Sequence, residues 1–254
     1  MKRIPVALTE DQMSEQPVMD PTIHRRRLRS ELRKARDAAD KTQRETARAM
    51  DWSMSKLIRI ETGDVRISTN DLRALLSYYQ VGAERAEQLL EMARAAREPA
   101  RWARYRNVAT LEYLAYLGYE ASAAIIRNFE PILMPGLLQT EEYAREFLLQ
   151  VEAPQNIDSL VDLRMERQEL LVRNPSPSLH FIIDESVVRH VVGGPEVMRR
   201  QLTHLKTVAA QPHVSLRIVT FDKGVYSRMR VPYVLFRISG YRGRGCSLHR
   251  KRDR

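Results

Sequence analysis

Two short helices separated by a tight turn are the sequence feature that most narrows the possible folds of this chain. The segment TQRE at 42–45 has the form of a capping box, in which a threonine oxygen and a glutamate carboxylate satisfy free N–H groups at a helix start. Asp51-Trp52 predicts a tight connection, and Ser53 is predicted to cap the next helix. That helix is expected to end at Gly63, because glycine suits a left-handed C-terminal position.

Helical periodicity continues on both sides of this pair. A preceding helix is predicted from Arg25, because apolar residues recur at i, i+4 and i+7, at Leu28, Leu32 and Ala35. Two more helices are predicted after the pair, over 68–79 and 83–97. The first part of the chain is therefore expected to be an all-α bundle.

The chain is predicted to divide where this helical pattern stops. Residues 1–21 lack periodicity and are expected to form a mobile leader. Pro99 cannot continue a helix, so a first domain is expected over 22–98 and a second over 99–240. Short strands are predicted in the second, at 179–183, 214–219 and 232–238. The expected fold class is an N-terminal all-α helix-turn-helix bundle followed by an α+β C-terminal domain.

Positive charge is concentrated at two places in the chain. The net charge is +10, and residues 22–79 hold 14 Lys and Arg against 8 Asp and Glu. Residues 241–254 hold 6 against 1. The first cluster lies in the helical segment and favours a nucleic-acid partner. The second is rich in Arg and Gly, cannot build a core, and is expected to be a disordered basic tail.

Composition also restricts the compartment and the cofactors. No run of about 18 apolar residues is present, and the first residues lack the apolar core of a secretory signal. Cys246 is the only cysteine, which excludes an internal disulfide and a cysteine-rich metal site. We therefore expect a cytoplasmic protein with no membrane association, no metal and no cofactor.

A short helix, a tight turn and a second helix with exposed polar side chains form the helix-turn-helix geometry, whose second helix fits the DNA major groove. The segment TQRETARAMDWSMSKLIRIETG resembles the core of the XRE-type helix-turn-helix family, which includes lambda-repressor and Cro-like proteins. The resemblance covers residues 28–79. It implies that the partner of this segment is double-stranded DNA.

By position, the resemblance also implies which side chains meet the DNA. Contacts with DNA phosphates are implied for Gln43, Lys56 and Arg66. The groove entry and the base edges are assigned to Ser53, Met54, Ser55 and Arg59. An arginine can bond a guanine at two atoms, whereas methionine offers only apolar contact, so we expect limited direct base readout. The resemblance further implies a structural salt bridge between Arg36 and Glu61, with Leu57 and Ile60 facing the core.

The second half of the chain carries a separate resemblance. The motif PGLLQT followed by EYAR is similar to the domain of unknown function that commonly follows an XRE-type helix-turn-helix in actinobacterial regulators. The segments RMERQELL, IIDESVVRHVVGGPEVMRRQLTHL and VSLRIVTFDKGVY continue the match in order. The resemblance implies a transcriptional regulator, antitoxin-like and controlled by a small partner protein encoded nearby. After Ser239 the sequence departs from the family pattern, as a truncated or frame-shifted end would.

The number of chains is also predicted, and two alternative functions stay open. The chain is expected to form a homodimer, because one recognition helix reads only a few base pairs and such proteins span two half-sites. One alternative is a protein-interaction module that uses the helix-turn-helix fold as a scaffold. The other is a hydrolase-like enzyme that uses Asp184 and Glu185 with His180 or His190. Acids that follow a strand more often cap the next helix, so no catalytic residue is expected.

Overall fold

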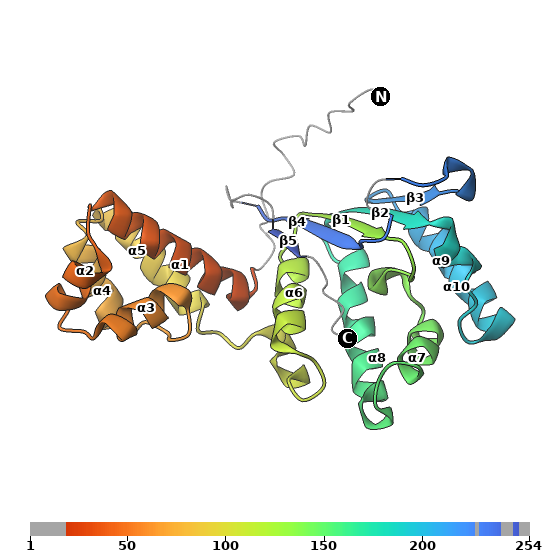
Figure 1. Ribbon diagram of the computed structural model, residues 1–254, viewed down its shortest axis with the longest axis horizontal. Coiled ribbons are helices and arrows are strands. Elements are labelled where there is room, and N and C mark those ends of the chain that lie inside the picture. The colour runs from red at the N-terminus through yellow and green to blue at the C-terminus, as the bar shows by residue number, and fades with distance from the viewer. Residues whose placement is uncertain (1–18, 227–228, 240–245, 249–254) are drawn as a thin grey trace. The chain divides into compact units, whose positions relative to one another are not determined.

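The computed structural model describes residues 19–226, 229–239 and 246–248 of the chain (Figure 1). The chain forms two compact units, Met19–Ala103 and a second unit that begins at Arg104. The described part of the first unit is built from helices, and the second unit combines helices with a mixed sheet. The predicted fold class, an all-α bundle followed by an α+β domain, is confirmed.

The first unit is a bundle of short helices around one apolar core. Its helices are α1 (Pro21–Ala38), α2 (Gln43–Ala49), α3 (Met54–Thr62), α4 (Thr69–Tyr78) and α5 (Ala83–Ala95). At the starts of α2, α3 and α4, the hydroxyls of Thr42, Ser53 and Ser68 accept hydrogen bonds from backbone N–H groups three residues on. Apolar side chains from all the helices except α2, among them Leu32 and Leu76, then meet in the core. The capping signals in the sequence thus account for where these helices begin.

Helix α1 begins earlier than its apolar periodicity predicts. The buried carboxylate of Asp20 accepts a hydrogen bond from the Thr22 N–H at 2.8 Å and so caps the helix. Pro21 occupies the first helical position, where its missing N–H leaves no bond unmade. The expectation of a mobile leader over 1–21 is therefore wrong for its last residues, and residues 1–18 lie outside the described part.

The second unit alternates helices and strands. Its helices are α6 (Leu111–Ala121), α7 (Glu141–Leu149), α8 (Ile157–Arg167), α9 (Glu185–Arg189) and α10 (Gly194–Ala209). Its strands are β1 (Ile125–Glu130), β2 (Ser178–Asp184), β3 (Val214–Val219), β4 (Tyr233–Arg237) and β5 (Cys246–Leu248). Its short 3-10 turns are η3 (Gly136–Leu138), η4 (Pro154–Asn156), η5 (Gln168–Leu171) and η6 (Phe221–Lys223), and a further one, η2 (Arg101–Tyr105), contains the boundary between the units. Within the described ranges, none of the helices combines the length and apolar character that a membrane crossing needs.

The strands form one mixed sheet in the order β3-β2-β1-β4-β5. Strands β1, β2 and β3 are parallel, and β4 and β5 each run antiparallel to the strand before them in that order. Strand β1 was not predicted, because no glycine or proline separates it from α6. The expectation of a disordered tail over 241–254 is wrong for Cys246–Leu248, which pair with β4, and the rest of the tail lies outside the described residues.

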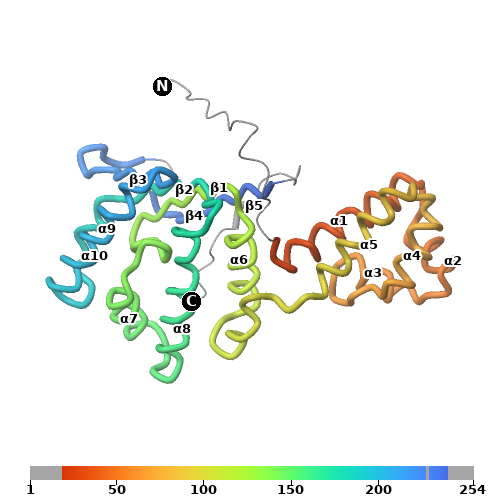
Figure 2. Tube along the Cα trace, turned by 180° about the vertical axis from the view of Figure 1, so that it is seen from behind, coloured from red at the N-terminus to blue at the C-terminus, as the bar shows by residue number. Residues whose placement is uncertain are grey.

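The two faces of this sheet differ. Along β2, Leu179, Phe181 and Ile183 are fully buried, whereas the alternating His180 and Ile182 are partly exposed. Both views show the helices of this unit on one side of the sheet (Figures 1 and 2). Among the described residues no helix covers the opposite face, which is called the open face below.

Candidate nucleic-acid interface

Helix α3 is fixed at both ends by local backbone geometry. In the turn before it, Asp51 adopts a φ of 53°, a left-handed conformation that Asp tolerates better than most residues. The hydroxyl of Ser53 then accepts a hydrogen bond from the Lys56 N–H at 3.2 Å. The helix ends at Gly63, whose φ of 88° favours glycine. A Cβ at this position would also overlap the guanidinium of Arg29.

Helix α1 holds the C-terminal end of α3 through its arginines. The guanidiniums of Arg29 and Arg33 donate to the carbonyls of Thr62 and Glu61, respectively. These carbonyls lie in the last turn, where a helix has unsatisfied acceptors and a partial negative charge. The two arginines therefore fix the position of α3 rather than extend the charged surface.

The expected Arg36–Glu61 pair is present, with Arg36 Nε 2.7 Å from Glu61 Oε1. The other carboxylate oxygen accepts a hydrogen bond from Gln43 Nε2, also at 2.7 Å. The hydrogen bond to Glu61 raises the pKa of Arg36, so its guanidinium stays charged. Gln43, assigned to a phosphate by the resemblance, thus has its amide nitrogen bonded within the protein, which links the start of α2 to α3.

The exposed side of α3 forms a single stripe. Ser55, Ile58, Arg59 and Thr62 follow the spacing i, i+3, i+4 and i+7 and are all exposed, while Leu57 and Ile60 are buried. Met54 lies beside the stripe at the start of the helix and is also exposed. The side chain of Arg59 makes no hydrogen bond or ion pair with any residue that the structure describes, and the same holds for Arg66. Both arginines are therefore available to a ligand.

Lys56 is placed differently from the other assigned residues. Its ammonium lies 4.1 Å from the centre of the Trp52 ring and 3.3 Å from Asp71 Oδ2. The side chain is half-buried between α3 and α4. A phosphate at this position would have to compete with the Asp71 carboxylate, so Lys56 is a weaker phosphate ligand than its position in the sequence implies.

Three exposed residues beside the predicted contacts are not among those that the sequence predicts. Arg44 and Arg48 of α2 are exposed, lie one turn apart, and have no hydrogen bond or ion pair to any described residue. Their i, i+4 spacing opposite the buried Thr46 and Ala47 was the available signal. The third, Ile58, is an exposed aliphatic residue in the middle of α3, and only its exposure distinguishes it from a core residue.

Three residues of the enzyme alternative, Asp184, Glu185 and His180, each have a hydrogen-bond partner outside that set. Asp184 caps α9 and accepts a hydrogen bond from the Tyr226 hydroxyl at 2.7 Å, while Glu185 accepts from the Phe221 N–H at 2.9 Å and pairs with Arg189. His180 Nε2 lies 3.0 Å from Ser178 Oγ. No described residue hydrogen-bonds to the other ring nitrogen of His180, where the histidine of a Ser-His-Asp triad is held by its carboxylate.

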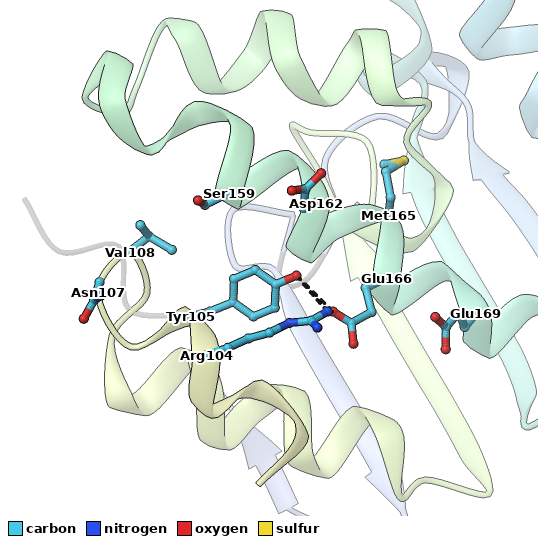
Figure 3. Close-up of a pocket in the computed structure, with 9 residues that line it drawn as sticks. All are labelled: Arg104, Tyr105, Asn107, Val108, Ser159, Asp162, Met165, Glu166 and Glu169. Carbon is cyan, nitrogen blue, oxygen red and sulfur yellow. Dashed lines mark hydrogen bonds and ion pairs between the residues drawn. The ribbon is translucent and has the colours of Figure 1, made fainter.

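The described residues contain no metal-binding cluster, and the second unit contains an open cavity. Among the residues that the structure describes, no group of three His, Cys, Asp or Glu side chains is placed to hold a metal ion. An open cavity of about 890 Å³ lies between η2 and α8 (Figure 3). Arg104 and Tyr105 both point to Glu166, and the Tyr105 hydroxyl donates to it at 2.9 Å. Ser159 lines the cavity, but none of the nine lining residues is a histidine or lysine that could activate it.

Comparison with known protein families gives two matches. A model described as a helix-turn-helix domain matches residues 27–89, the segment that contains α2 and α3. A second model, described as a domain of unknown function (DUF5753), matches residues 113–249. No curated protein and no solved structure matches the chain. Helix-turn-helix domains are typical of DNA-binding regulators, which agrees with the exposed stripe on α3.

Proposed function

The chain belongs to the family described as domain of unknown function (DUF5753) and carries a helix-turn-helix domain before it, from which we propose that the protein is a sequence-specific transcriptional regulator. The single observation that carries this proposal is the stripe on α3. Its side chains are exposed and polar or aliphatic, and Arg59 has no partner among the described residues. A helix of this kind can enter the major groove and read base edges.

The finer assignment is an XRE-type regulator with an antitoxin-like role and a small partner protein. The bonds that join Glu61 to Arg36 and Gln43 support the XRE-type assignment, because the family resemblance implies the Arg36–Glu61 pair. The proposal of a small partner protein is supported only by the sequence resemblance in the second half of the chain. Double-stranded DNA remains the proposed partner of the first unit.

Two features of the structure favour regulation over the two alternatives. Asp184 and Glu185 are occupied in capping α9 and holding the Phe221 N–H, so a hydrolase would have to release both from structural bonds. A scaffold for protein contacts would not need an arginine without a partner, such as Arg59, on the exposed stripe of α3. We therefore propose that the protein is a non-enzymatic, cytoplasmic DNA-binding protein.

The sharpest test compares two arginines on either side of Gly63. Arg59 lies on the stripe, where its fork can hold one guanine, and Arg66 follows the helix end, where we expect contact with phosphate only. Arg59→Ala should cost about 1–3 kcal/mol on the operator and relax the preference at one base pair. Arg66→Ala should weaken binding to all sequences and lower the salt slope by about 1.

The measurement is fluorescence anisotropy on operator and scrambled duplexes over a salt series, with the operator found by genome-wide crosslinking and immunoprecipitation. Arg199→Ala is the matched control, because it removes the same charge from an exposed position on α10 in the second unit. If Arg59→Ala weakens binding to the operator and to the scrambled duplex equally, this arginine reads no base, and the scaffold alternative is favoured.

A further inference from the structure

The open face of the sheet brings basic residues from several strands together. In the register of the strands, Arg127 of β1 lies beside His180 of β2, which in turn lies beside Ser215 of β3. Arg217 is two residues beyond Ser215 and therefore points to the same face. Adjacent strands are about 5 Å apart, so these four side chains surround one small area of the face.

This area is hollowed, and no carboxylate is among the described residues that line it. A cavity of about 260 Å³ is lined by Arg127, His180, Ser215 and Arg217 together with Asn128 and with apolar and aromatic neighbours. Both arginines are exposed and make no hydrogen bond or ion pair with any residue that the structure describes. The carboxylate of Asp184, further along β2, is bonded to the Ser186 N–H and the Tyr226 hydroxyl instead.

The two guanidiniums disfavour a positive charge on the His180 ring, which belongs to the strand between theirs. Burial lowers the pKa of His180, and the positive charges of Arg127 and Arg217 lower it further. The imidazole is therefore kept neutral beside two guanidiniums. Repulsion of this kind is uncompensated in the described chain and would be relieved by a bound anion.

We propose that this cavity is a binding site for a small phosphate monoester. Two guanidiniums can each hold phosphate oxygens through paired N–H donors, and the Ser215 hydroxyl can donate a further hydrogen bond. Ile182, Leu235 and Tyr233 lie beside the basic residues and offer apolar contact to a short carbon skeleton. This site goes beyond the proposed DNA-binding function and does not depend on it.

Other occupants fit the same features less well. A second copy of the chain docked through this face would bring its own arginines against these and would be repelled. Nucleic-acid phosphates are diesters with one negative charge, whereas a monoester near neutral pH carries close to two and gains more from two guanidiniums. The volume of the cavity suits a phosphate and a few carbon atoms rather than a folded partner.

The first test is calorimetric titration of the full chain with phenyl phosphate. Arg127→Gln and Arg217→Gln should each weaken binding by about tenfold, the loss expected for one hydrogen-bonded charge. Arg237→Gln is the matched control, because Arg237 is exposed on the same face in β4 but does not line the cavity. Unchanged melting temperatures would show that all three variants fold.

The second test follows the His180 ring by NMR during a pH titration. Saturation with phenyl phosphate should raise the pKa of His180, because the dianion offsets the two guanidiniums. Inorganic phosphate should produce the same direction of shift more weakly, since it lacks the carbon skeleton. DNA binding is measured separately, so loss of this site would leave the proposed function standing.

Three results would overturn the proposal. The first is no binding of phenyl phosphate at millimolar concentration, and the second is an equal loss of affinity in Arg237→Gln. The third is an unchanged His180 pKa at saturation. Binding of an unphosphorylated acidic peptide that phenyl phosphate does not displace would assign the face to a protein partner instead.

Discussion

Glu61 holds α3 in position through its side-chain carboxylate. It is buried, pairs with Arg36 of α1, and accepts a hydrogen bond from Gln43 of α2. Glu61→Ala removes the buried carboxylate that pairs with the mostly buried Arg36 guanidinium, which then keeps only the exposed Asp37 carboxylate and the Lys41 carbonyl as partners. Because these compensate the buried charge only in part, the free energy of unfolding should fall by about 3 kcal/mol. Urea denaturation of the chain, followed by the signal of the first unit, measures this loss.

A double-mutant cycle provides the control for Glu61. The variant that carries both Arg36→Ala and Glu61→Ala should lose less than the sum of the single losses, because the second change removes the charge that the first left unpaired. Strictly additive losses would show that the two side chains do not interact in solution.

At the scale of elements, the motifs of the second unit converge on one buried polar network. The guanidinium of Arg167 in α8 holds both carboxylate oxygens of Glu120 in α6, at 2.8 and 2.9 Å, and also donates to the Tyr113 hydroxyl. A Cβ at Gly136, in the segment PGLLQT, would lie 3.0 Å from Arg167 Nη1. Gln201 of α10 accepts from the Thr140 N–H and donates to the Leu138 carbonyl. These motif residues therefore have a structural role in joining α6, α8 and α10 to the PGLLQT segment.

Arg167→Met should destabilise the second unit by about 3–5 kcal/mol, because it leaves the Glu120 carboxylate buried without its cation. Adding Glu120→Leu should restore part of the loss, since an apolar pair needs no counter-charge. Thermal and urea unfolding of the single and double variants measure both effects. A double variant no more stable than Arg167→Met would contradict this account.

The cap of α9 should make the second unit sensitive to acid. Burial alone would raise the pKa of Asp184, but hydrogen bonds from the Ser186 N–H and the Tyr226 hydroxyl lower it overall. A carboxyl with a lowered folded pKa stabilises the fold above its unfolded value, about 3.9, and loses that contribution as pH falls through the folded pKa. Stability should therefore decline below about pH 4.

Asp184→Asn keeps a capping side chain and should flatten this decline. Urea unfolding at a series of pH values measures the effect. An unchanged pH dependence in the variant would assign the loss of stability to other groups.

The sequence predicts elements better than it predicts contacts. Local signals such as the Thr42 and Ser53 caps place the ends of α2 and α3, because each depends on residues within one turn. Strand β1 was missed, since its neighbours in the sheet come from distant segments and no turn residue precedes it. The Lys56–Asp71 contact and the basic cluster of the open face depend on helix packing and strand register, which local patterns do not contain.

At the scale of the whole molecule, the two compact units divide the work that we propose. Residues 22–79 carry 14 Lys and Arg against 8 Asp and Glu, and this excess lies in the unit that contains α3. The second unit buries its motif residues in structural bonds and leaves one face of its sheet open. The proposed DNA-recognition surface and the proposed phosphate-monoester site are therefore built from separate sets of residues.

The number of chains on the operator follows from the size of α3. A helix of nine residues presents the four side chains of its stripe, enough for only a few base pairs. Specific affinity in the usual range needs more contacts, and two half-sites about 34 Å apart would supply them. We therefore expect two chains on each operator.

Light scattering of the complex with a full operator should give two chains per duplex. A half-site duplex is the control, and it should bind one chain far more weakly. A single chain bound with the same affinity to both duplexes would contradict the homodimer.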